Sequence, residues 1–440
     1  MRVLVINGSP KGKNSITYQT IRFLQKKFPK DEFDVIHAGA QIGVWEQDMS
    51  GVAASVKWAQ LIVFAYPVYA FIAPSQLHRF IALMKEQGID FTGKYATQIT
   101  TSKHFYDVTA HRYIEENCKD MGMCTIRGFS ADMDDLLAKK GQLEVITYWN
   151  YVKHIIKQGQ EAYEERQGQD KAPTREKSEK YHVVIVTDCT KENRRLRQMI
   201  VDFRKALPFA SHVVNLQNFS FRGGCLGCFH CATEGDCVYQ DGFHELLRKI
   251  QKADSIVYAF SIKDHSMGTL FKTYDDRQFC NGHRMVTMGK PTAYLIDGEF
   301  SKEENLQMIL EGRSQVGGNF LAGIATNEGV GGDCIRTCAD KLAYALVHRM
   351  RVNENFYGIG GKKIFRDLVY EMQGIMHADH QFYKKHQLYD FPQKKIRTLL
   401  FMKLVGMLLR MPKSKAAVQA KMTEGMLEPY EKVIHGSTLE

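Results

Sequence analysis

Residues 1–15 read MRVLVINGSPKGKNS, and this stretch indicates the fold. Its apolar part, residues 2–8, is short and rich in β-branched side chains, which is typical of a β-strand. A polar loop with two glycines follows, and a helical pattern begins near Ser15. A buried strand that passes through such a loop into a helix is the repeating unit of a doubly wound parallel sheet.

The same plan occurs twice along the 440 residues. Strand patterns in the first half recur in the second half in the same order: 2–8 with 182–188, 61–68 with 255–262, 94–102 with 290–297, and 124–131 with 319–326. Strands that are apolar throughout and alternate with helices indicate a parallel sheet buried on both faces. We therefore predict an α/β protein with two tandem, doubly wound sheets of five parallel strands each.

The predicted domains are residues 1–160, residues 181–353 and a C-terminal extension, residues 354–440. Residues 159–180 are almost entirely polar and contain Pro173, which is typical of a helix end that runs into a linker. The extension is basic and rich in aromatic side chains, so we expect it to be ordered.

The net charge of +10 is concentrated near the C-terminus, because residues 391–423 contain eight Lys or Arg and no Asp or Glu. This suits an acidic partner, an anionic membrane surface or anionic cofactors. No nucleic-acid motif accompanies the charge, so we expect no nucleic-acid partner. Residues 398–411 are apolar but too short to span a bilayer, and we favour a partner domain or dimer interface over a membrane surface as their cover. No export signal is recognised, so a cytoplasmic protein is expected.

The loop at residues 7–15 is a candidate anion site, because it offers side-chain donors, lysines and a helix N-terminus. It has neither the Walker A order nor G-x-G-x-x-G, so a dinucleotide held in the Rossmann manner is disfavoured. A plain strand-to-helix turn capped by Ser15 is the alternative. The candidate cofactor-binding residues of this loop are Ser9, Lys11, Asn14, Ser15 and Ile16.

Two further loops, residues 65–81 and 100–107, are expected at the same edge of the sheet. Tyr69 and Phe71 can form a flat apolar wall against a ring system, so the three loops together fit FMN. The residues expected to frame the ring are Pro67, Val68, Tyr69, Ala70, Phe71, Thr101, Ser102 and His104. His104 and Tyr106 are candidate catalytic proton donors, and the alternative is that they only pack and hydrogen-bond around the ring.

These motifs resemble those of the flavodoxin-like NAD(P)H-dependent FMN reductases and, more closely, of tandem flavodoxin-family oxidoreductases and iron–sulfur flavoproteins of anaerobic bacteria. The resemblance rests mainly on GSPKGKNS (8–15), YPVYAFIAPSQLHRF (66–80) and TTSKHFYDVTAH (100–111), and it covers roughly residues 1–350. It implies two flavodoxin-like domains, noncovalent FMN and two-electron chemistry with NAD(P)H as co-substrate. It fixes neither the acceptor nor the choice between NADH and NADPH.

The second copy is not expected to hold a flavin. Its loop at 187–196 lacks glycine and carries Asp188 and Glu192, which would repel a phosphate. The loop at 261–268 has lost the Pro-Val-Tyr sequence of its counterpart. We expect the second domain to form a wall of the flavin site in the first, as the second subunit does in dimers of the resembled family.

The second copy contains CLGCFHCATEGDC at residues 225–237, which resembles the compact cysteine motif of iron–sulfur flavoproteins. The candidate ligands of a [4Fe-4S] cluster are Cys225, Cys228, Cys231 and Cys237. A zinc site and a glycine-rich turn without metal remain open.

The sequence thus predicts an FMN-dependent NAD(P)H oxidoreductase that reduces a small electron-poor acceptor, such as a quinone, a flavin, a nitro compound or an enone. The alternative is a carrier that passes single electrons between FMN, a cluster and a redox protein partner. A binding protein with a vestigial flavin site is the third hypothesis. Assembly as a homo-oligomer stays open.

Overall fold

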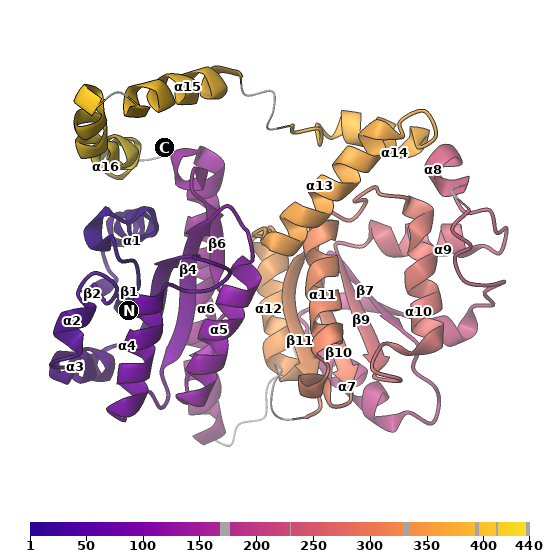
Figure 1. The fold of residues 1–440 in the computed structure, drawn as a ribbon. Coiled ribbons are helices and arrows are strands. Elements are labelled where there is room, and N and C mark those ends of the chain that lie inside the picture. The colour runs from indigo at the N-terminus through magenta and orange to yellow at the C-terminus, as the bar shows by residue number, and fades with distance from the viewer. Residues whose placement is uncertain (168–176, 229, 329–333, 392–395, 411, 437–440) are drawn as a thin grey trace. The chain divides into compact units, whose positions relative to one another are not determined.

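The computed structural model describes residues 1–167, 177–228, 230–328, 334–391, 396–410 and 412–436 (Figure 1). The chain forms two compact units, Met1–Gly168 with Phe391–Glu440, and Gln169–Asp390. The extension that we predicted as one segment therefore divides at about residue 390 between the two units.

The sheet of the first unit is parallel, with the strand order β2-β1-β3-β4-β5, and β6 also pairs with β4. The strands are β1 (Arg2–Asn7), β2 (Glu32–Ile36), β3 (Leu61–Pro67), β4 (Tyr95–Ser102), β5 (Cys124–Thr125) and β6 (Phe129–Asp132). The order reverses beside β1, as in flavodoxin-type sheets. Both the α/β class and the parallel, doubly wound arrangement are confirmed.

The predicted strand at 124–131 is broken, so this sheet has six strands where we expected five. The hydroxyl of Thr97 on β4 donates to the carbonyl oxygens of Ile126 at 3.0 Å and Arg127 at 3.3 Å. A Cβ atom at Gly128 would lie 2.4 Å from Cγ of Gln98. The backbone pairing is thus interrupted between β5 and β6. The hydroxyl of Thr97 binds the carbonyl oxygens there, and the backbone at Gly128 lies too close to Gln98 for any residue but glycine.

Helices cover both faces of the first sheet (Figure 1). One face packs against α3 (Ser50–Trp58), α4 (Ser75–Glu86) and α5 (Asp107–Asp120), and the other against α1 (Ile16–Lys27) and α6 (Lys139–Gln167). A short helix, α2 (Ile42–Trp45), precedes α3. Strand residues such as Val3 and Leu4 are fully buried on opposite faces, which explains why β1 is apolar throughout.

The second unit has a five-stranded parallel sheet with the order β11-β10-β9-β7-β8. Its strands are β7 (Ser178–Thr187), β8 (Phe209–Asn215), β9 (Ser255–Ser261), β10 (Pro291–Asp297) and β11 (Phe320–Thr326). One face packs against α9 (Phe243–Lys252), α10 (Gly268–Arg277) and α11 (Glu304–Gly317), and the other against α7 (Arg194–Ala206) and α12 (Ile335–Val347). The second doubly wound sheet is confirmed.

Side-chain contacts explain how the extension divides. In the second unit, α13 (Phe356–Glu371) packs on α11, and α14 (His377–Lys385) carries the buried Asp379, whose carboxylate lies 3.0 Å from Nδ1 of His283. In the first unit, α15 (Ile396–Arg410) precedes α16 (Pro412–His435), which packs on α1. Among the described residues, no helix combines the length and the apolar character that crossing a bilayer needs.

Candidate functional site

Three loops follow neighbouring strands of the first sheet at the edge where the strands end. They are residues 8–15 after β1, residues 68–74 after β3 and residues 103–106 after β4. The three strands are adjacent and parallel, so their carboxyl ends, and the loops that follow them, meet at one edge. This is the edge at which the sequence predicted a cofactor.

The first loop is organised by Asn7 at the end of β1. The side-chain amide of Asn7 donates to the carbonyl oxygen of Gly12 at 2.9 Å and accepts from the backbone N–H of Ser9 at 3.2 Å. Gly12 has a φ of +53°, and a Cβ there would lie 2.9 Å from that of Ala40. The loop therefore needs glycine at this position, because its turn is left-handed and tightly packed.

The N-terminus of α1 is open toward this loop. The N-cap residue Ser15 is buried but its side chain makes no capping hydrogen bond, and no acidic residue lies in the first turn. In the same turn, Oγ1 of Thr17 is buried and, in the described structure, without a hydrogen-bond partner. Lys11 and Lys13 are exposed beside it. Open N–H groups, two buried hydroxyls and two cations make a site for an anion.

The second loop is a two-residue turn in which neither residue is glycine. Tyr69 and Ile72 exchange backbone hydrogen bonds of 2.8 and 3.0 Å, while Ala70 and Phe71 have φ angles of +44° and +73°. L-residues rarely adopt such angles, so the turn stores strain, as ligand-binding loops often do. The side chains of Tyr69 and Phe71 are 43% and 49% exposed, and are thus accessible to a ring system.

Aromatic side chains join the second loop to the third. The ring centroid of Phe71 lies 5.2 Å from that of Phe105 and 4.7 Å from that of Tyr106. The hydroxyl of Thr109, in the first turn of α5, donates to the carbonyl oxygen of Phe71. The sequence did not single out Phe105, although its place in the loop between two candidate residues was a usable signal.

A buried hydrogen-bonded group lies behind the third loop. Nδ1 of His104 lies 3.0 Å from Oδ2 of Asp107, which also accepts from the hydroxyl of Ser130 at 2.6 Å. Burial alone would lower the pKa of His104, but the hydrogen bond and charge of Asp107, together with the charges of Asp132 and Asp135, raise this pKa above 6.5. The sequence identified His104 but neither partner, although His104 and Asp107 are spaced i, i+3 at a helix start.

Thr101 completes the set of inward-facing donors. Its Oγ1 atom, at the end of β4, is buried and has no hydrogen-bond partner in the described structure. The adjacent Ser102 accepts from the backbone N–H of His104 at 2.9 Å and thereby fixes the third loop. An unpartnered buried hydroxyl at the site edge is costly unless a ligand satisfies it.

The structure thus distributes the predicted residues over three levels of exposure. Ser9, Ser15, Thr101 and His104 are buried. Ile16, Pro67, Val68, Ser102 and Tyr106 are half-buried. Lys11, Asn14, Tyr69, Ala70 and Phe71 are exposed. All fourteen lie in or next to the three loops.

The matching edge of the second sheet is closed by its own side chains. Asn193 caps α7 by accepting from the backbone N–H of Leu196 at 3.0 Å, and its amide donates to Ser261 at 2.5 Å and to Asp297 at 3.2 Å. In the sheet register, Ser261 pairs with Asp297 as Pro67 pairs with Thr101 in the first unit. A carboxylate therefore stands where the first unit has an unpartnered hydroxyl.

Asp188 lies at the same edge of the second unit and adds to this difference. It is buried after β7, and burial raises its pKa to about 6 although Lys263 acts in the opposite direction. A second carboxyl group close to the helix start is unfavourable for a phosphate.

The cysteine loop does not form a metal cage within the part of the chain that the structure describes. Cys225 and Cys228 are exposed, whereas Cys231 and Cys237 are half-buried. Sγ of Cys231 donates to the carbonyl oxygen of Phe279 at 3.0 Å. Residue 229 lies outside the described residues, and among those described no three His, Cys, Asp or Glu side chains converge on a metal position. The four-cysteine cluster stays a prediction.

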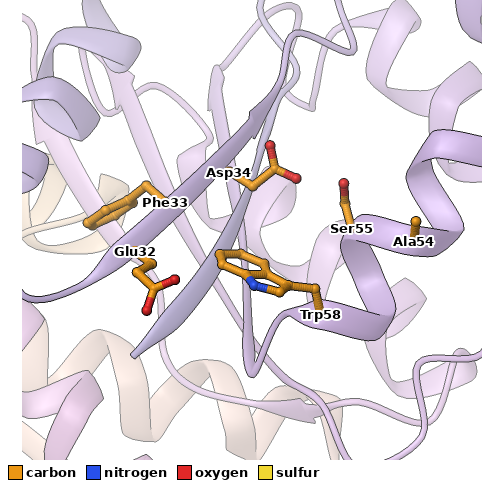
Figure 2. Close-up of a pocket in the computed structure, with 6 residues that line it drawn as sticks. All are labelled: Glu32, Phe33, Asp34, Ala54, Ser55 and Trp58. Carbon is orange, nitrogen blue, oxygen red and sulfur yellow. The ribbon is translucent and has the colours of Figure 1, made fainter.

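An open pocket lies elsewhere on the first unit. Figure 2 shows it between the edge strand β2 and α3, lined by Glu32, Phe33, Asp34, Ala54, Ser55 and Trp58. Glu32 pairs in register with Arg2 at the start of β1, whereas the three loops follow the strand ends. With two carboxylates and no cation in its lining, this pocket is unsuited to a phosphate.

Comparison with known proteins agrees with the geometry of the first unit. A family model described as NADPH-dependent FMN reductase matches residues 1–134. The iron–sulfur flavoprotein of Archaeoglobus fulgidus is 25% identical over 170 residues, which are 37% of this chain and 77% of that protein.

Solved structures similar to this chain include an FMN-dependent NADH-azoreductase from Bacillus anthracis, in complex with FMN. It is 16% identical, and the match covers 33% of this chain and 95% of that one, with a TM-score of 0.26. General stress protein 14 from Treponema denticola, also in complex with FMN, is 14% identical, with 35% and 99% covered and a TM-score of 0.28.

The donor set of the first unit fits the cofactor that the family name implies. The buried hydroxyls of Thr17 and Thr101 lack partners, the start of α1 is open, and lysines but no carboxylates lie in the first loop. These features suit a phosphate at the first loop and polar ring atoms near the end of β4. The family match supports a flavin-dependent, NAD(P)H-dependent oxidoreductase. Residues 1–134, which contain all three loops, are thus similar to the NADPH-dependent FMN reductase family.

Proposed function

We propose that the first domain binds FMN in its three loops and uses NAD(P)H to reduce a small electron-poor acceptor, such as a quinone, a flavin, a nitro compound or an enone. The observation that carries this proposal is the pair of buried, unpartnered hydroxyls, Thr17 and Thr101, at the edge of the sheet where the open end of α1 lies. A family match to residues 1–134 supports it.

The phosphate would be held by residues around the start of α1. Ser15 and Thr17 supply buried hydroxyls, and the first N–H groups of α1 supply donors that have no partner within the helix. Lys11 and Lys13 neutralise charge from solvent. When bound, FMN supplies hydride and electron transfer between the nicotinamide donor and the acceptor.

The second and third loops orient and shield the ring. Tyr69 and Phe71 offer exposed aromatic surface, and Thr109 ties their turn to α5. The contacts of Phe71 with Phe105 and Tyr106 hold the exposed ring of Phe71 in place. The acceptor class follows from this apolar, aromatic entrance, which favours flat and poorly hydrated molecules.

His104 is the group we assign to proton supply. Asp107 fixes its ring through Nδ1 and favours the protonated form, which is the form that can donate a proton. Ser130 in turn holds the carboxylate of Asp107 at 2.6 Å. Tyr106, which is half-buried and starts α5 with a φ of +54°, is a weaker candidate because its ring packs against Phe71.

We propose one FMN per chain. The second unit caps its helix with Asn193, and it places Asp188 directly after the strand that precedes this helix and Asp297 at the position of Thr101. The open helix start of the first unit is therefore missing there, and two carboxyl groups are added.

Anaerobic titration of the purified full-length protein tests this function. We expect about one FMN per chain, bleaching of its absorbance by NADH or NADPH, and reoxidation by quinones or nitro compounds. Protein that refuses added FMN, or that is bleached by dithionite but by neither nicotinamide, would refute the proposal.

A second candidate function is electron transfer through a cluster at Cys225, Cys228, Cys231 and Cys237 to a redox protein. The similarity to a protein named iron–sulfur flavoprotein favours it. Iron and acid-labile sulfide analysis decides the matter, because flavin absorbance masks that of a cluster. Four irons per chain together with bleaching by a ferredoxin alone would favour this candidate.

A further inference from the structure

Helix α15 exposes an apolar surface that the described part of the first unit does not cover. The large apolar side chains that are half or more exposed are Ile396 (65%), Leu399 (52%), Leu400 (61%), Phe401 (62%), Leu404 (50%) and Met407 (56%). Six such side chains within twelve residues exceed the scattered apolar exposure of an ordinary surface helix. A surface of this kind is a binding surface.

The positive charge around α15 indicates which kind of partner this surface binds. Residues 391–423 contain eight Lys or Arg and no Asp or Glu, and five of the eight lie outside the helix, on either side of it. A second copy of this chain would bring two such segments together, and the like charges would repel each other. An anionic lipid surface is complementary to the cations and accepts the apolar side chains at the same time.

The length of α15 determines how it would lie. Fifteen residues make a helix of about 22 Å, which is shorter than the apolar core of a bilayer, about 30 Å. The helix also carries Lys403 near its middle and ends at Arg410. A helix of this length that binds a bilayer lies in the plane of the interface, with the stem of Lys403 reaching toward the headgroups.

The helix that follows is attached to the flavin domain. In α16, Tyr430 and Ile434 are buried, the hydroxyl of Tyr430 donates to the carbonyl oxygen of Met133, and Glu431 forms an ion pair with Arg22 of α1. A partner that binds α15 is therefore coupled to the first unit through α16 rather than through a free tail.

We propose that α15 is an in-plane anchor that docks the flavin domain on anionic phospholipid membranes. Apolar insertion supplies part of the affinity, and the basic residues make it depend on lipid charge and on salt. Docking does not require the site to contain FMN, so it stands apart from the proposed catalytic function. The sequence alone favoured a protein cover for this segment, and the exposed side chains of α15 change that preference.

Vesicle flotation of the full-length protein tests the anchor. We expect binding to phosphatidylcholine vesicles that contain about one third phosphatidylglycerol, binding about tenfold weaker to phosphatidylcholine alone, and loss of binding as salt rises. The double variant Leu400→Ser/Phe401→Ser should lose binding by about tenfold or more, because two inserting side chains are removed. Lys403→Glu should weaken binding to anionic vesicles only.

Ile364→Ser is the matched control, since Ile364 in α13 is 64% exposed but its basic neighbours, Lys362 and Lys363, are paired with Glu354 and Asp367. We expect it to bind vesicles like the native chain. All variants should keep the native far-UV circular dichroism, which shows that they fold whether or not FMN is bound. Equal binding by the native chain and the double variant, or no binding to anionic vesicles, would overturn the proposal. The proposal would also be overturned if the native chain formed a dimer that the double variant converted to monomers, because a second copy of the chain would then cover this surface.

Discussion

Nδ1 of His104 lies 3.0 Å from Oδ2 of the fully buried Asp107, in a loop where His104 itself has a φ of +60°. Positive φ is costly for histidine, so the surrounding hydrogen bonds hold the residue in place. Ser130, twenty-six residues further along the chain, holds the same carboxylate. The pair therefore gives the site a histidine with a fixed ring and a raised pKa.

His104→Asn tests the charge of this histidine, because asparagine tolerates the left-handed backbone but does not titrate. Folding raises the pKa of His104 above 6.5, so its contribution to stability is fully present below about pH 6.5 and is lost as pH rises through the folded-state pKa. We expect the native chain to lose stability relative to the variant as pH rises above about 6.5. Urea unfolding measures this, followed by tryptophan fluorescence, because the three tryptophans, residues 45, 58 and 149, all lie in the first unit.

His111→Gln tests a histidine in the same domain whose effect on stability should change with pH in the opposite direction. Burial lowers the pKa of His111 to about 4, so the unfolded chain binds the extra proton and stability rises with pH between about 4 and 6.5. If the two variants showed the same pH dependence relative to the native chain, the assignment of charge to His104 would be wrong.

Thr17→Val should separate cofactor binding from stability. Because Oγ1 of Thr17 has no partner, its replacement by a methyl group should leave the free energy of unfolding of the FMN-free protein unchanged or raise it slightly. Loss of a donor to phosphate should weaken FMN binding by about tenfold. The measurements are fluorescence titration with FMN and urea unfolding.

Thr97→Val is the matched control for this substitution. The hydroxyl of Thr97 donates to the carbonyl oxygen of Ile126 at 3.0 Å and does not face the three loops. Its loss should destabilise the protein by about 1 kcal/mol and leave the FMN affinity unchanged. Equal effects of the two variants on FMN binding would contradict the phosphate assignment.

The predicted parts of this protein are those that local sequence specifies. Strand β1 is apolar throughout and its loop has Gly12 where a left-handed turn is required, so both were readable from a few adjacent residues. The break between β5 and β6 could not be predicted in this way, because it depends on the hydroxyl of Thr97 from another strand. The role of Ser130 was not predicted for the same reason, since only the folded chain brings its hydroxyl to Asp107.

The division of the C-terminal extension was unpredictable for a related reason. Nothing near Tyr430 in the sequence indicates that its hydroxyl meets Met133, almost three hundred residues earlier. Composition predicted an ordered extension, but only tertiary contacts assign its two parts to different units.

Alanine substitutions at the starts of α1 and α7 should have contrasting effects. Asn193 caps α7 through its side chain, so Asn193→Ala should destabilise the second unit by about 1 kcal/mol without changing FMN content. Ser15 makes no capping bond, so Ser15→Ala should cost much less stability but weaken FMN binding. Hydrogen exchange in α7 and FMN titration measure the two effects. A loss of FMN in the Asn193 variant would indicate a flavin in the second unit.

Ala70→Gly tests the strain in the second loop. Glycine adopts a φ of +44° without steric cost, so the free energy of unfolding should rise by up to about 1 kcal/mol. The more flexible turn should bind FMN more weakly, because it is less pre-organised for the ring. The control is Ala73→Gly, at a buried position outside the positive-φ turn, which should lower stability instead. A loss of stability in both variants would show that the turn is not strained.

Arg277→Lys tests what holds the cysteine loop on the second unit. The guanidinium of Arg277 is 1% exposed, donates twice to Asp241 at 2.9 Å and once to the carbonyl oxygen of Gly223, and lies 4.6 Å from the ring centroid of Tyr239. Burial would raise the pKa of Asp241, but the hydrogen bonds from Arg277 and from backbone N–H groups lower it to about 2. This carboxylate therefore contributes stability above about pH 4 that is lost as pH falls through about 2.

A lysine cannot reproduce the two parallel hydrogen bonds, so we expect the variant to lose about 2–4 kcal/mol and residues 222–243 to exchange their amide hydrogens much faster. Arg79→Lys is the control, because Arg79 pairs with Glu46 and Glu86 on an exposed surface and should cost less than about 1 kcal/mol. Unchanged exchange across the cysteine loop in Arg277→Lys would mean that the loop is held by its own turns. In that case Arg277 would not contribute to the geometry of a metal site in the loop. Faster exchange would mean that the positions of the four cysteines depend on Arg277.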